Sequence, residues 1–174
     1  IILSNGSAQT GAVTATYDGI EVINFSAAGA TGVKTATVDT SLTLDSDQLE
    51  KVVVTGASAA NLTVDLTGAD LETQTSEFDA SAAGGAITAH VTKGDSATVK
   101  VTMSKQDDWL DYNGALASTA TLDGGEGTDT LELDTDLAYS SAATAQAGAG
   151  VSNFETLRLA SGTDVDERAL TGNA

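Results

Sequence analysis

The sequence contains no cysteine and no proline, and both absences limit the folds and the chemistry that it can support. Without cysteine there are no disulfides and no thiolate metal sites, which excludes zinc ribbons and thiol catalysis. Without proline, glycine is the main residue available for turning the chain. Aromatic residues make up only 4% of the 174 residues. A core built from alanine, valine, leucine, isoleucine and threonine is therefore expected to be thin and regular, as in stacked coils.

Basic residues are also few: lysine and arginine number 7 against 25 aspartates and glutamates, giving a formal net charge of −18. They form no basic patch in the sequence, so nucleic acid is not expected as a partner. Carboxylates at this density repel one another in a compact state unless counter-ions gather, and divalent cations are their natural complement. A solvated acidic surface would have the same composition, so charge alone does not decide between the two. No apolar run is long enough to span a bilayer.

One stretch carries a specific pattern, because residues 122–132 read L-D-G-G-E-G-T-D-T-L-E. From Gly124 onward it matches the nonapeptide G-G-x-G-x-D-x-U-x of calcium-loaded parallel β-rolls. Glycines permit positive φ and close backbone approach in a tight turn whose carbonyls can face a cation. Asp129 offers the hard oxygen ligand that calcium requires. The sequence therefore predicts a calcium site formed by Asp123, Gly125, Gly127 and Asp129.

A weaker copy of this pattern lies 21 residues upstream, where Asp108-x-Leu110 repeats Asp129-x-Leu131. Such a separation corresponds to one coil of a solenoid. The glycines of the pattern are absent here, and their places are taken by Met103, Ser104 and Gln106. Only side chains are then available as ligands. We expect Asp108 and Asp111 to form a second calcium half-site.

Short stretches of two-residue alternation recur along the chain, and threonine and valine are common in them. Three stretches share one phrase, an apolar residue and a glutamate followed by alternating apolar positions, at 20–25, 49–54 and 154–159. A recurring phrase indicates a repeat architecture in which each coil buries its face against the next. The fold class expected is all-β, a parallel β-solenoid or β-roll-like stack of short strands, with a β-sandwich as the alternative. We expect one β-rich module over residues 1–174, a fragment of a longer protein, with a calcium β-roll-like segment around 104–136.

The nonapeptide at 124–132 and the strand phrases resemble those of RTX (repeats-in-toxin) proteins, in particular RTX-type bacterial surface-layer proteins and related large secreted surface proteins. The resemblance implies export, an extracellular location at the bacterial cell surface, calcium-dependent folding and a structural role. It implies calcium ions as the bound cofactor, and self-association or contact with other cell-surface components. RTX rolls repeat the nonapeptide in tandem, whereas this chain carries one complete copy.

Catalysis is not expected from these residues. His90 is the only histidine, and a Ser-His-Asp triad would have to use it, yet no G-x-S-x-G accompanies it. Two alternatives to a structural calcium-binding module stay open. One is an adhesin-type binding domain that recognises a glycan or a cell surface, and the other is a non-catalytic segment of an RTX-secreted hydrolase.

Overall fold

The structure is a computed structural model that describes residues 2–4, 13–16, 22–26, 38–45, 50–66, 75–93, 98–114, 119–134 and 150–160. These residues form fourteen short β-strands. The strands are β1 (Ile2–Ser4), β2 (Val13–Thr16), β3 (Val22–Ser26), β4 (Val38–Asp45), β5 (Lys51–Gly56), β6 (Ala60–Leu66), β7 (Thr75–Ala83), β8 (Ile87–Lys93), β9 (Thr98–Thr102), β10 (Trp109–Asn113), β11 (Thr121–Asp123), β12 (Thr130–Leu133), β13 (Val151–Ser152) and β14 (Thr156–Leu159). Within these ranges there is no helix long and apolar enough to cross a membrane.

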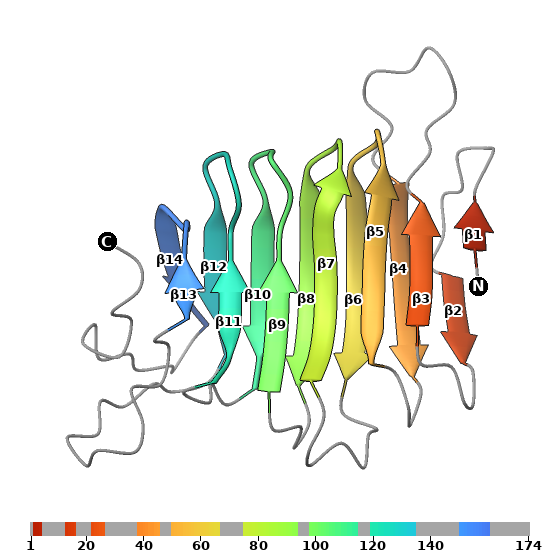
Figure 1. Cartoon of the computed structure of the whole chain (residues 1–174), viewed down its shortest axis with the longest axis horizontal. Coiled ribbons are helices and arrows are strands. Elements are labelled where there is room, and N and C mark those ends of the chain that lie inside the picture. Colours follow the sequence, from red (N-terminus) through yellow and green to blue (C-terminus); the bar gives the residue numbers. More distant parts are fainter. Residues whose placement is uncertain are drawn as a thin grey trace.

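The strands form two seven-stranded sheets, in the orders β1-β3-β5-β7-β9-β11-β13 and β14-β12-β10-β8-β6-β4-β2. All of the strand pairings within both sheets are parallel. The chain alternates between the sheets, so that odd strands run upward and even strands downward in Figure 1. Each coil thus contributes one strand to each sheet. The prediction of an all-β, parallel β-roll-like stack is confirmed, whereas a sandwich of Greek-key type would need antiparallel sheets.

The coils around β8 to β12 repeat at a constant length. Trp109 pairs with Thr88 in β8 and with Thr130 in β12. In the other sheet Thr121 pairs with Lys100. Hydrogen bonds between equivalent positions accordingly join residues 21 apart. The 21-residue spacing seen in the sequence is therefore one coil of the roll.

In β3, β5, β9, β10 and β12, alternate residues face the space between the sheets and are buried there, whereas all four residues of the last strand, β14, are exposed. In the even-numbered sheet, Ala89, Leu110 and Leu131 form one inward column, and each is at most 1% exposed. In the odd-numbered sheet, Val101 and Leu122 occupy an equivalent column. Alanine, valine, leucine and isoleucine make up most of the described interior, but Phe25, Phe78, Tyr112 and Phe154 are buried there as well. The composition therefore predicted the aliphatic part of the core, and it did not predict these aromatic side chains.

The three copies of the strand phrase do not occupy equivalent places. The copies at 20–25 and 49–54 do stack in register, since Ile23 pairs with Val52 and Phe25 with Val54 between β3 and β5. The copy at 154–159 forms β14 in the opposite sheet, where Leu157 pairs with Leu131. The phrase therefore specifies a strand, but it does not specify which sheet the strand joins.

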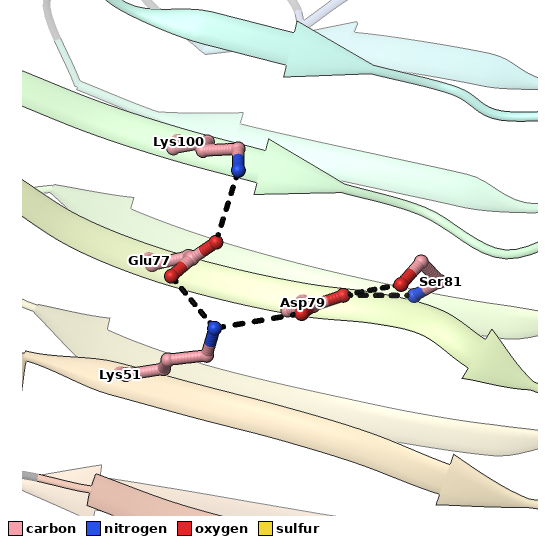
Figure 2. A network of polar contacts seen from close by, with 5 residues as sticks. All are labelled: Lys51, Glu77, Asp79, Ser81 and Lys100. Carbon is pink, nitrogen blue, oxygen red and sulfur yellow. Dashed lines mark hydrogen bonds and ion pairs between the residues drawn. The ribbon is translucent and has the colours of Figure 1, made fainter.

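On the outward face of the odd-numbered sheet, charged side chains join successive coils (Figure 2). The Lys51 Nζ lies 2.8 Å from the Glu77 Oε2 and 3.5 Å from the Asp79 Oδ2, and the Lys100 Nζ lies 3.1 Å from the Glu77 Oε1. The Asp79 carboxylate also accepts hydrogen bonds from the backbone N–H and hydroxyl of Ser81. Nearby lysines hold the pKa of Glu77 below its usual range. Opposite charges on adjacent strands favour this register over its alternatives.

Candidate metal centre

Two corners lie side by side at the upper end of the roll in Figure 1 and connect the odd-numbered sheet to the even-numbered sheet. We call residues 124–129, between β11 and β12, the glycine corner. We call residues 103–108, between β9 and β10, the serine corner. The glycine corner contains Gly125, Gly127 and Asp129 of the predicted calcium site, and it packs directly on the serine corner. Their side-by-side position follows from the 21-residue coil.

Asp129 is the buried centre of the glycine corner. Its side chain is 0% exposed, and its Oδ1 accepts a hydrogen bond of 2.7 Å from the backbone N–H of Asp108. Its second oxygen, Oδ2, is buried and has no hydrogen-bond partner. Burial raises the pKa of Asp129 to about 6, and the nearby carboxylates of Asp108, Glu155 and Asp107 add to the rise. A buried carboxylate oxygen without a partner is costly, so this atom calls for a proton or a cation.

The two predicted glycines stand where the backbones of neighbouring coils come closest. Gly125 has a φ of 96° and Gly127 a φ of 131°, a region that residues with a side chain rarely adopt. A Cβ on Gly125 would lie 1.9 Å from the carbonyl oxygen of Ser104, and one on Gly127 would lie 2.6 Å from that of Gln106. The glycines therefore allow main-chain carbonyl oxygens of the serine corner to approach the turn that holds Asp129.

Asp123 lies at the entrance of the glycine corner but has partners of its own. Its Oδ1 accepts hydrogen bonds from the Gly125 backbone N–H at 3.1 Å and from the Asn153 amide at 2.7 Å. Asn153 adopts a left-handed φ of 58°, a conformation that asparagine tolerates better than most residues. Asp123 thus fixes the first turn of the corner and ties it to the next coil.

The predicted half-site residues Asp108 and Asp111 are not brought together. Asp108 is 3% exposed and points into the serine corner, where its carboxylate accepts hydrogen bonds from Ile87 and Ser104. Asp111 lies on the outward face of β10, where its Oδ2 is 2.7 Å from the Nδ1 of His90. Its other oxygen, Oδ1, is buried without a hydrogen-bond partner. Successive side chains of a strand face opposite sides, which separates two residues three positions apart.

A column of carboxylates links the coils through the corners, and sequence reasoning missed its last member. The Asp108 carboxylate accepts a hydrogen bond from the backbone N–H of Ile87, and the Asp129 carboxylate accepts a hydrogen bond from the backbone N–H of Asp108. The Glu155 carboxylate in turn accepts a hydrogen bond of 2.7 Å from the backbone N–H of Asp129. Each acid therefore satisfies a backbone donor of the coil before it. Glu155 was recognised only as the glutamate of the strand phrase at 154–159, because it lies 26 residues from Asp129, not 21, and belongs to a shorter corner.

The oxygen atoms of the glycine corner are of the kind that bind a hard divalent cation such as calcium. Calcium takes about six to eight oxygen ligands from carboxylates, main-chain carbonyls and waters. The corner offers the unpaired Asp129 Oδ2 and main-chain carbonyls close to Gly125 and Gly127. Among the described residues, no group of three or more histidine, aspartate or glutamate side chains is placed to hold a metal. Main-chain oxygens and water would have to complete the coordination of Asp129.

Comparison with other proteins gives no match for this chain, whether with models of protein families, with curated proteins or with solved structures.

Proposed function

We propose that this chain is a structural calcium-binding module of a secreted bacterial surface protein of the RTX type. In this proposal calcium binds at the glycine corner, with Asp129 as its side-chain ligand, and stabilises the contact between adjacent coils. The module has no catalytic role. Its partners are calcium ions and other components of the cell surface, including further copies of itself.

The observation that carries the proposal is the buried Oδ2 of Asp129, which has no hydrogen-bond partner. The desolvation of this oxygen is not offset by any donor in the described residues, and the nearby carboxylates of Asp108, Glu155 and Asp107 raise the pKa of Asp129 further. A divalent cation at this oxygen would neutralise the charge of Asp129 and reduce its repulsion with these acids. The carbonyl oxygens beside Gly125 and Gly127 supply neutral ligands of the kind that calcium accepts.

The distribution of charge over the roll supports the same proposal. Every lysine and arginine whose side chain the structure describes already pairs with a carboxylate on a neighbouring coil. These residues are Lys51, Lys100, Lys105 and Arg158. The described basic side chains are therefore engaged elsewhere, and none of them pairs with Asp129. With a net charge of −18, the chain has many more acids than bases, so cations from solution are its remaining source of positive charge.

The free energy of calcium binding would contribute directly to the free energy of folding, because an unfolded chain has no preformed glycine corner. A ligand that binds only the folded state at about a thousand times its Kd stabilises that state by about 4 kcal/mol. For a domain of this size, that corresponds to a rise in the melting temperature of roughly 10 °C. Such coupling would keep the chain weakly folded where calcium is scarce and stabilise it outside the cell.

The test is thermal unfolding of the wild type, Asp129→Asn and Asp134→Asn, each in excess EDTA and in millimolar calcium, with calcium affinity measured by titration calorimetry. Asp134 is a matched control, because it is an exposed acid at the far end of β12. We expect calcium to raise the melting temperature of the wild type and of Asp134→Asn, but not that of Asp129→Asn. Magnesium should act more weakly because it demands a smaller and more regular site. An identical wild-type melt in EDTA and in calcium would refute the proposal.

A further inference from the structure

The serine corner and the glycine corner correspond residue for residue at a spacing of 21. Lys105 Nζ lies 2.7 Å from the Glu126 Oε1, and the Thr128 backbone N–H donates to the Asp107 Oδ1 at 2.9 Å. The Asp108 backbone N–H donates to Asp129 at the same spacing. Position by position, Ser104 therefore corresponds to Gly125, and Asp108 corresponds to Asp129.

In the serine corner, Ser104 satisfies the buried acid completely. The Ser104 backbone N–H donates to the Asp108 Oδ2 at 2.7 Å, and its hydroxyl donates to the Asp108 Oδ1 at 3.0 Å. The backbone N–H of Ile87 donates to the same Oδ1 at 2.7 Å. Both oxygens of Asp108 thus have donors, although burial raises the pKa of this carboxyl as well.

In the glycine corner, the corresponding donors are missing. Gly125 has no hydroxyl, and its backbone N–H donates to the Asp123 Oδ1 at 3.1 Å, not to Asp129. The Asp129 carboxylate keeps only the donor from Asp108, and its Oδ2 has none. Asp129 and Asp108 are 0% and 3% exposed, so the two acids differ in their donors and not in their burial.

We infer that Ser104 takes, in the serine corner, the place that a divalent cation takes in the glycine corner. Asp108 is then a structural hydrogen-bond acceptor and not a metal ligand, which revises the half-site expected from the sequence. Of the two corners, the glycine corner holds the cation site, at Asp129, and the serine corner, in the coil formed by β9 and β10, folds without metal. That coil presents the Ser104 carbonyl oxygen against Gly125 before any ion binds. This inference rests on the proposed function, because it assigns the calcium to one of two neighbouring corners.

The experiment compares Asp108→Asn, Ser104→Ala and Asp129→Asn with the wild type in the full chain. Calcium stoichiometry and affinity are measured by titration calorimetry, and melting temperatures in EDTA and in calcium. We expect one calcium per described stack in the wild type and at least a tenfold loss of affinity in Asp129→Asn, the range seen when a metal site loses a supporting group. Ser104→Ala should melt at a lower temperature in EDTA and in calcium alike, with an unchanged calcium-induced shift and an affinity within about threefold of wild type.

The outcomes separate the assignment of the cation to the glycine corner from the proposed function itself. If calcium stabilises the wild type and either Asp108→Asn or Ser104→Ala abolishes this effect while remaining folded, the assignment to one corner is wrong and the proposed function stands. A stoichiometry of two that falls to one in Asp108→Asn would overturn the assignment in the same way. If the wild type binds no calcium, the proposed function fails and this inference fails with it. Should Asp108→Asn not fold, Ser104→Ala decides, because it leaves the carboxylate and two of its backbone donors in place.

Discussion

Replacing Gly125 with alanine should destabilise the roll strongly, and the size of the effect can be worked out from the structure. A left-handed φ of 96° costs alanine about 1 kcal/mol or more. The new Cβ would lie 1.9 Å from the Ser104 carbonyl oxygen, against an ordinary contact of 3.4 Å or more, so the corners must separate. Separation stretches the hydrogen bonds that Glu126 and Thr128 donate to the serine corner and the one that Asp108 donates to Asp129. At about 1 kcal/mol for each bond, the total loss is about 4 kcal/mol.

The measurement is urea denaturation followed by circular dichroism in EDTA, where no cation contributes. Gly84→Ala is the matched control, because Gly84 is an exposed turn residue without a left-handed φ and its added Cβ would approach other atoms no closer than 3.3 Å. We expect the control to change the free energy of unfolding by less than about 1 kcal/mol. If Gly125→Ala proves as stable as Gly84→Ala, the close packing of the glycine corner on the serine corner is wrong.

Three further predictions concern other parts of the roll. In EDTA, the folded pKa of Asp129 of about 6 lies above its ordinary 3.8, so its contribution to the free energy of unfolding should fall by about 2 kcal/mol as pH rises from 4 to 7; the difference between wild type and Asp129→Asn in urea melts measures it. Leu122→Ala should lower the free energy of unfolding by about 2–5 kcal/mol, because Leu122 is 0% exposed in the core; an exposed site such as Thr121→Ala is the comparison. Glu77→Gln should cost about 1 kcal/mol in low salt and less in 1 M salt, because its lysine pairs are partly exposed; an effect that persists in salt would contradict this.

The fold class could be predicted because it depends on alternation and spacing, both of which are visible in the sequence. The 21-residue separation of Asp108 and Asp129 already gave the coil length that the strand register confirms. The longest strand, β7, was not predicted, since Thr75–Ala83 is rich in serine, alanine and acids that favour other structures in isolation. Its inward face combines the large Phe78 with the small Ser76 and Ala80, and parallel neighbours on both sides supply its hydrogen bonds.

The geometry around the candidate site could be predicted only in part from the sequence. Motif matching found the corner of Asp129, and the structure places Gly125 and Gly127 as the pattern requires, with positive φ. The sequence pattern could not distinguish a carboxylate that has hydrogen-bond donors from a carboxylate that lacks them. That difference depends on where the backbone N–H groups of Ser104 and Gly125 point. Such directions are set by the packing of one coil on another, which no local pattern encodes.

The equal lengths of the coils from β8 to β12 have a consequence for how this molecule could change in size. A duplicated stretch of one 21-residue period would insert another rung about 4.8 Å thick and offer each new side chain the same kind of neighbours. Removing an odd number of residues within a strand would shift the alternation beyond the deletion, so that the side chains there that had faced the interior would face water. Growth by tandem duplication is thus open to this architecture, whereas piecemeal lengthening of its strands is not.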